Sequence, residues 1–177
     1  MIVLPTKIAA VWIIGFEKRI DERGFFARTW CHREFQRHGL NPGLLQCNVS
    51  AWNYNRTLHG MHHQTASHKE TKLVRSTRGA IFDVVLDLRP ASSTSQRCIS
   101  AQLSEDDGLI TCVSEGCAHG FQTLSDDTEV AFHISESFQP ECARGVRWDD
   151  PTFSIQWPAC GRRLISDRDA IYPNFAC

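Results

Sequence analysis

Short runs of apolar and β-branched residues recur along the whole chain, and turn-forming residues separate them. Glycine, proline or aspartate-rich turns fall at Arg78-Gly79, Arg89-Pro90 and Asp106-Asp107-Gly108. Runs of this length and composition, bounded by turns, predict β-strands. The predicted strands cover residues 8–16, 44–49, 73–76, 80–88, 99–103, 109–113, 129–134 and 154–157. Their spacing favours an all-β fold, an antiparallel sandwich or barrel.

Helical patterns are confined to two places. Residues 30–38, followed by Gly39, predict one helix, and residues 166–170 predict a second short turn. The chain has no internal repeat, no low-complexity linker and no shift in composition that would mark a second domain. We therefore expect a single domain over residues 1–177, with a ligand site in the mouth of the barrel.

Composition and charge favour a globular protein and argue against some classes of partner. With 177 residues, 42% of them hydrophobic, the chain can bury a substantial core. Its 19 basic and 20 acidic residues form no long run of either sign, which argues against a nucleic acid or an anionic membrane surface as partner. The apolar stretch at 8–16 is too short to span a bilayer. Eight cysteines without a Cys-x-x-Cys pair favour free thiols and a cytoplasmic location.

The most informative segment is residues 57–64, Thr-Leu-His-Gly-Met-His-His-Gln, because it gathers three of the eight histidines. A regular strand would place His59 and His63 on one face and His62 alone on the other. An imidazole titrates close to neutral pH, so a general base is one interpretation of His62. A metal site, or a histidine bonded to the backbone inside a barrel, would explain the cluster equally well.

Eight sequence blocks, taken in order and with their spacing, carry a resemblance to a known family. The blocks are residues 21–26, 46–50, 58–64, 72–75, 82–89, 115–121, 148–151 and 166–169. With them, the chain resembles the dTDP-4-dehydrorhamnose 3,5-epimerases, cupin-fold isomerases of nucleotide-deoxysugar synthesis, over nearly its whole length. The resemblance implies a cupin jelly-roll barrel and a homodimer with exchanged N-terminal segments. The resemblance also implies catalysis without a metal ion or an organic cofactor.

The implied substrate is a nucleotide-linked 4-keto-6-deoxy sugar, with dTDP as the expected nucleotide, epimerised at C3, C5 or both in deoxysugar and polysaccharide biosynthesis. The ketone acidifies the C3 and C5 hydrogens, so the reaction proceeds through an enolate. Epimerisation needs a base on one face of the sugar, stabilisation of the enolate oxygen and a proton donor on the opposite face.

The resemblance also implies roles for individual residues. By motif position, His62 is the base, Asp169 its carboxylate partner and Lys72 the cation near the C4 oxygen. His119 and Asp83 match further pocket residues. Taken alone, Asp169 would be interpreted as a solvated surface acid, and Lys72 as an exposed lysine at a strand edge. Substrate contacts are expected from Arg23, Phe26, Gln46, Asn48, His59, His119 and Phe138.

Three positions depart from the family pattern. His59 stands in place of the usual arginine, Arg28 displaces a glutamate, and Phe132 replaces the tyrosine that usually donates the proton on the opposite face. Phenylalanine has no proton to give, so we expect inversion restricted to C3, or an altered activity. His133 and Tyr54 are candidate substitute donors, although His133 should point to the other side of the strand from Phe132.

Two alternative functions fit part of the pattern. A metal-dependent cupin enzyme could use His59, His62, His63 and His119 as ligands, although no glutamate follows at the spacing that metal cupins usually show. A non-catalytic relative that only binds a sugar nucleotide would tolerate the loss of the donor. The epimerase is favoured because base, lysine and carboxylate are all present, and binding alone would not require that combination.

Overall fold

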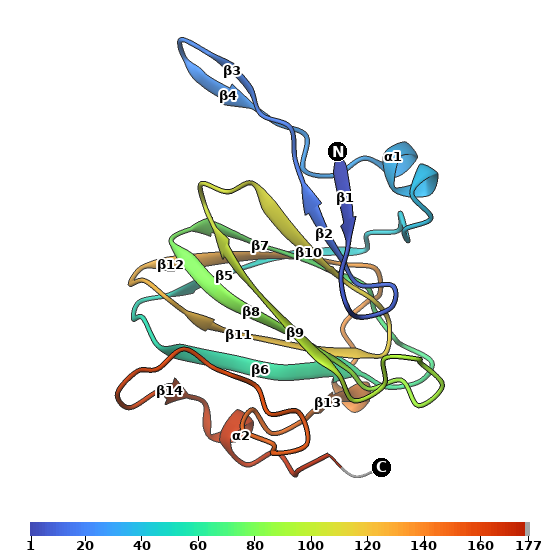
Figure 1. Ribbon diagram of the computed structural model, residues 1–177, viewed down its shortest axis with the longest axis vertical. Helices are drawn as coiled ribbons and strands as arrows, with labels where there is room; N and C mark the ends of the chain where they lie inside the picture. The colour runs from blue at the N-terminus through green and yellow to red at the C-terminus, as the bar shows by residue number, and fades with distance from the viewer. Residues whose placement is uncertain (176–177) are drawn as a thin grey trace.

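Two sheets face each other in the computed structural model, which describes residues 1–175 (Figure 1). The first sheet consists, in spatial order, of β1 (Ile2–Pro5), β2 (Trp12–Gly15), β10 (Leu109–Val113), β7 (Lys72–Arg78), β12 (Thr128–Ile134) and β5 (Gln46–Trp52). The second consists of β13 (Ala143–Gly145), β6 (Thr57–Gln64), β11 (Cys117–Thr123), β8 (Ala80–Asp87) and β9 (Cys98–Ser104). Neighbours in these orders pair antiparallel, and β14 (Leu164–Ile165) adds to β6 in parallel.

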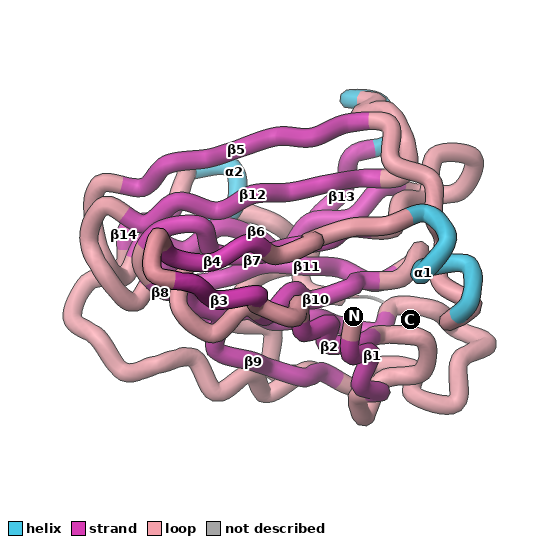
Figure 2. The backbone as a smooth tube through the Cα atoms, turned by 90° about the horizontal axis from the view of Figure 1, so that it is seen from above, coloured by secondary structure: helices cyan, strands magenta, loops and turns pink. Residues whose placement is uncertain are grey.

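A few elements lie outside the two sheets. The hairpin of β3 (Arg19–Asp21) and β4 (Gly24–Phe26) projects away from the body of the barrel (Figure 1). Helix α1 (His32–Arg37) follows the hairpin, and the 3-10 turn η1 (Pro140–Cys142) precedes β13. The view from above shows strands through the centre and helices at the periphery (Figure 2). Helix α2 (Asp167–Ala170) belongs to the C-terminal segment, which lies against β6, the strand that carries the histidine cluster.

The core forms between the sheets and is extended on both outer faces. Between the sheets, Val74 and Val130 meet Val85 and Phe121, all of them buried. Each such buried side chain contributes about 1.5–3 kcal/mol relative to exposure. On the outer face of the second sheet, Met61 packs in a separate cluster with residues of the C-terminal segment. This covering layer holds the C-terminal segment in place over β6.

The predicted all-β barrel is confirmed, and most predicted strands correspond to observed ones within a few residues. Only Trp12–Gly15 of the run at 8–16 is a strand, because Val11 N–H bonds back to Ile8 O in a turn before it. The strand predicted at 154–157 is wrong. That stretch is a loop on the outside of the second sheet, where Ile155 and Trp157 pack as cover. Its apolar side chains are partly buried without strand pairing.

Two further features of the described residues concern the cysteines and the helices. All seven cysteines within residues 1–175 are free. In the same part of the chain, no helix is long and apolar enough to cross a membrane.

Candidate active site

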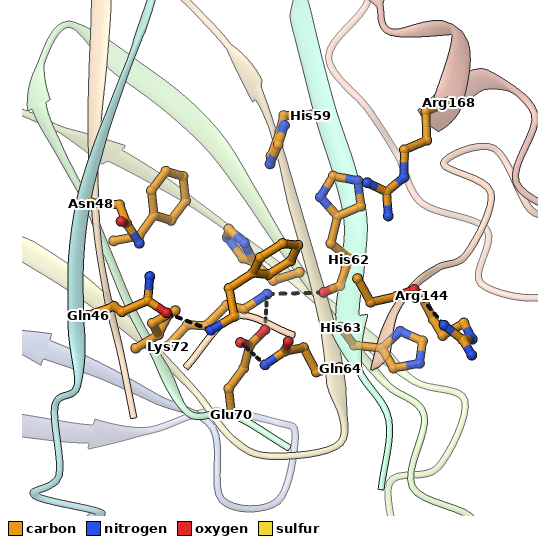
Figure 3. A pocket seen from close by; sticks show the side chains of 15 residues that line it. Gln46, Asn48, His59, His62, His63, Gln64, Glu70, Lys72, Arg144 and Arg168 are labelled. Atoms are coloured by element: carbon orange, nitrogen blue, oxygen red, sulfur yellow. Dashed lines mark hydrogen bonds and ion pairs between the residues drawn. The ribbon is translucent and has the colours of Figure 1, made fainter. Parts of the chain in front are cut away.

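A pocket of about 440 Å³ opens between the two sheets. Strands β5, β6, β7, β11 and β12 supply most of its lining, together with the segments before β7, around β13 and at α2. Gln46 and Asn48 of β5 lie on one side, and His62 of β6 lies on the other (Figure 3). The barrel mouth therefore gathers polar side chains that are far apart in the sequence.

His59 and His62 both line this pocket, with their ring centroids 4.5 Å apart. The prediction that His62 stands alone on its face is therefore wrong. The reason is an irregularity in the pairing of β6 with β11, where three residue steps on β6 match two on β11. Such a bulge changes the side on which the following side chains lie. Met61, next to His62, is turned outward into its own apolar cluster.

Gly60 makes the bulge possible. Its φ is 129°, a conformation that residues with a side chain rarely adopt. A Cβ at this position would lie 2.5 Å from the Cα of Gly120 on the adjacent strand. Two glycines at the same level thus let β6 and β11 approach closely enough to bring both imidazoles into the pocket.

Asp169 holds His62 in place. Its Oδ1 lies 2.7 Å from His62 Nε2, and its Oδ2 accepts a hydrogen bond of 3.1 Å from the Gly60 N–H. The carboxylate is 3% exposed, and Ser166 caps α2 by accepting from the Asp169 N–H. Burial raises the pKa of the Asp169 carboxyl, but the hydrogen bonds from His62 and Gly60 outweigh burial and lower that pKa below its ordinary value. The pair is thus a neutral imidazole beside a carboxylate, or an imidazolium that the carboxylate stabilises.

Lys72 enters the pocket from β7. Its Nζ lies 2.8 Å from Glu70 Oε1 and donates to the carbonyl oxygen of His62 over 3.4 Å. Glu70 is itself held by Gln64, whose Nε2 donates to Oε2 over 2.9 Å. These contacts fix the ammonium group near the His62 side of the pocket (Figure 3).

His119 and Asp83 form a second histidine–carboxylate pair, which is more buried than the pair of His62 and Asp169. His119 Nε2 is 2.6 Å from Asp83 Oδ1, and both side chains are buried. The two residues face each other from β11 and β8, and His119 also borders the pocket. The sequence-based expectation that they are pocket residues agrees with this placement for His119, with Asp83 behind it.

Besides His62, the ring of His59 has three aromatic neighbours. Its ring contacts those of Trp52, Phe121 and Phe132, with centroids 5.4, 5.4 and 6.4 Å away. Within residues 1–175, no hydrogen bond to its ring is present. Burial, followed by the neighbouring His62, lowers the pKa of His59 to about 3. His59 is therefore a neutral imidazole at any ordinary working pH.

Phe132 lines the pocket between His59 and His119, with its ring 6.3 Å from that of His119. Neither candidate substitute donor reaches the cavity. Tyr54 is 62% exposed, and His133 lies on the strand position that alternates with Phe132 and is absent from the lining. No tyrosine belongs to the part of the pocket lining that residues 1–175 provide.

The residues expected to bind the nucleotide divide into two groups. Gln46, Asn48 and Phe138 line the pocket, and the Phe138 N–H donates to Gln46 Oε1 over 2.6 Å. Arg23 and Phe26 do not, because they belong to the projecting hairpin. The Arg23 side chain is 84% exposed and pairs with Asp21 of the same hairpin. Within one chain, the hairpin cannot deliver these two side chains to the pocket.

Several lining residues were missed by the sequence analysis. They are Glu70, Ile134, Ala143, Arg144 and Arg168, whereas His63 and Gln64 had been noted only as part of the histidine segment. Arg168 precedes Asp169 on α2, and its Nε donates to the hydroxyl of Tyr172 over 2.7 Å. The Tyr172 ring in turn meets the His62 ring at 5.9 Å. For Glu70, the one signal in the sequence was its position two residues before the predicted Lys72.

One group of side chains could hold a metal ion in the part of the chain that is described. It consists of His59, His62 and Asp169, one ligand atom of each lying within 4.8 Å of the others. The metal set considered from the sequence was different, since it included His63 and His119. His119 is instead bonded to Asp83.

The sequence of residues 5–176 matches the model of a family described as dTDP-4-dehydrorhamnose 3,5-epimerase. A protein of that name from Sinorhizobium fredii is 37% identical over 167 residues, which cover 94% of this chain and 86% of that protein.

Solved structures share the fold as well. The dTDP-4-dehydrorhamnose 3,5-epimerase of Bacillus anthracis, with TDP and PPi bound, superposes with a TM-score of 0.94 at 32% identity and covers 98% of both chains. A 3′-monoepimerase from Streptomyces bikiniensis, in complex with dTDP-quinovose, gives a TM-score of 0.90 at 26% identity and covers 97% of this chain and 86% of that one. By name, the similar proteins include both two-carbon and one-carbon epimerases.

Proposed function

Because the chain belongs to the dTDP-4-dehydrorhamnose 3,5-epimerase family, we propose that it epimerises a dTDP-linked 4-keto-6-deoxy sugar through an enolate. The observation that carries the proposal is the pairing of His62 with the buried Asp169 at the edge of the pocket, over 2.7 Å. A structure that only bound a nucleotide would not need a buried carboxylate behind a pocket imidazole.

His62 removes the proton from the sugar carbon next to the ketone. In the resting enzyme, its Nε2–H donates to Asp169, which leaves the Nδ1 lone pair to act as the base. As the proton arrives, the imidazolium forms beside a full negative charge. Asp169 therefore both fixes the tautomer and lowers the energy of the charged intermediate.

Lys72 stabilises the other product of proton removal, the enolate oxygen at C4. Its ammonium group is held by Glu70 and by the carbonyl oxygen of His62. A cation fixed in this way requires little rearrangement when negative charge develops on the substrate. The base and the lysine together make the reaction independent of a metal ion.

We further propose that inversion is restricted to C3. The support for this restriction is Phe132, an apolar ring between His59 and His119 in the pocket wall. With no phenol in that wall, the enolate must recover its proton from water or from another group. Deuterium exchange should then outpace net inversion.

The active form in this proposal is a homodimer. Arg23 and Phe26 are exposed at the end of a projecting hairpin, where Ile20 is also 78% exposed and Phe25 lies uncovered. Three exposed apolar side chains on one short hairpin would be costly in an isolated subunit. Insertion of the hairpin beside the partner's pocket would bury them and bring an arginine to the pyrophosphate.

The test is incubation with dTDP-4-keto-6-deoxyglucose in deuterated water, with exchange at C3 and C5 followed by NMR. The proposal predicts deuterium at C3 together with inversion there, and no inversion at C5. Efficient inversion at both carbons would contradict the restriction to C3. Tight dTDP binding without exchange at either carbon would contradict the epimerase and identify a sugar-nucleotide binder.

A further inference from the structure

We propose that the same pocket binds one Zn²⁺ ion, with His59, His62 and Asp169 as ligands, and that the bound ion inhibits the enzyme. One ligand atom of each residue already lies within 4.8 Å of the other two. Two imidazoles and one carboxylate are a usual ligand set for zinc, with a fourth position left open. The binding site stands independently of the proposed function, whereas the inhibition rests on it.

Two of the three ligands are already positioned. Asp169 is fixed by the Gly60 N–H and by its place on the capped helix α2, and His62 is fixed by Asp169. Bonds of about 2.0–2.2 Å to zinc require ligand atoms roughly 3.3 Å apart in a tetrahedral site. His59 must therefore move closer to His62 and Asp169 for all three ligand atoms to reach one zinc ion.

His59 is free to make that movement. Its contacts within residues 1–175 are with aromatic rings, at centroid distances of 4.5 to 6.4 Å, and no hydrogen bond holds it. Rotation of the ring toward Asp169 breaks no polar interaction. In the present arrangement, its nitrogens gain nothing from the surrounding rings, and a metal ion would give one of them a partner.

The nearest charge to the site, that of Asp169, favours a cation. Asp169 contributes a negative charge that is buried. Of the cations in the pocket lining, Lys72 is paired with Glu70 at 2.8 Å, and Arg168 keeps its charge while it donates to the hydroxyl of Tyr172. The open coordination position faces a cavity of about 440 Å³, which has room for a water molecule.

Zinc in this position removes the base from the reaction. A neutral imidazole that binds zinc through one nitrogen carries its proton on the other, so neither nitrogen of His62 can then take a proton, and a carboxylate bound to zinc no longer stabilises an imidazolium. The metal-free protein is the active form, and zinc and substrate compete for the pocket.

The binding test uses protein without a histidine tag, stripped with a chelator and titrated with Zn²⁺ in a calorimeter. Co²⁺ serves as a second probe, because its visible absorption reports tetrahedral coordination. We expect one ion per chain. His59→Gln should weaken zinc binding by at least about tenfold, since even changes in outer partners of metal ligands cost about 10–100-fold. Asp169→Asn should weaken it as well.

The matched control is His68→Gln. His68 also lies near a carboxylate, with Nδ1 3.8 Å from Glu136 Oε1, but it lies outside the pocket lining. Its replacement should leave zinc affinity unchanged. Equal affinities in wild type and in His59→Gln would overturn the site, as would a loss of affinity confined to His68→Gln.

Inhibition is tested in the deuterium-exchange assay. Zinc should lower the wild-type rate over the concentration range in which calorimetry detects binding, and a chelator should restore it. Binding without loss of rate would overturn the inhibition while leaving the site. If the metal-free protein shows no exchange at all, the proposed function fails and the inhibition with it, but calorimetry still decides the zinc site.

Discussion

Replacement of Asp169 by asparagine removes one charge from the site and hardly changes its volume. The carboxylate now serves two donors, the Gly60 N–H at Oδ2 and the His62 ring at Oδ1. Asparagine has only one oxygen acceptor. If that oxygen stays with Gly60, the NH₂ group faces His62 Nε2 and forces the imidazole proton onto Nδ1. His62 then presents an N–H to the sugar where a lone pair is needed.

The expected loss combines the wrong tautomer with the loss of a charge that stabilises the imidazolium. A comparable change in a histidine–aspartate pair costs about four orders of magnitude in rate. We expect exchange at the sugar to slow by about two to four orders of magnitude, or about 2.7–5.4 kcal/mol of activation free energy. The assay is deuterium exchange followed by NMR at saturating substrate.

The control for Asp169→Asn is Asp167→Asn, on the same short helix but exposed to solvent. This control loses a charge from α2 without touching His62, and it should retain the wild-type rate. Thermal unfolding of both variants separates loss of chemistry from loss of structure. An Asp169→Asn variant that is folded and within tenfold of the wild-type rate would remove Asp169 from the mechanism.

Other substitutions test the remaining parts of the site. His62→Ala should abolish exchange while dTDP binding, measured by calorimetry, stays largely intact; unchanged exchange would refute its role as base. Lys72→Met should slow exchange by about 10²–10³-fold, as the loss of an oxyanion donor does. A normal exchange rate in this variant would show that Lys72 does not stabilise the enolate. Phe132→Tyr should extend inversion to C5, and no gain by NMR would show that another group supplies the proton. Arg23→Ala should raise KM more than it lowers kcat, and sedimentation of an active monomer at micromolar protein would contradict the shared site.

The fold was predictable where a run of apolar residues forms a central strand. The run at 109–113 matches β10 at both ends, because its apolar residues pack on both faces of a central strand. The run at 154–157 alternates polar and apolar residues as a strand would, but it covers a sheet from outside without pairing. Composition reports that a segment is buried, and it does not report whether its backbone finds a neighbouring strand.

The site was predictable by residue type more than by geometry. His62, Lys72 and His119 come together in one pocket, as their motif positions implied. The bulge at Gly60 was not foreseen, since it depends on the close approach of Gly120 from a strand far away in the sequence. Arg168 and Tyr172 were missed for the same reason, because only the folding of the C-terminal segment over β6 brings them to His62.

The two departures from the family pattern with the greatest chemical consequence meet in space. The rings of His59 and Phe132 are neighbours, with centroids 6.4 Å apart, and both lie next to the Phe121 ring. His59 is neutral because burial and His62 lower its pKa to about 3, and Phe132 carries no dissociable proton. These two positions therefore offer neither a cation nor a phenol, whereas His62, whose ring centroid lies 4.5 Å from that of His59, is still backed by Asp169. Under the proposed mechanism, His62 with Asp169 removes the proton, but neither His59 nor Phe132 can return one. That asymmetry is the physical reason for expecting one inverted carbon rather than two.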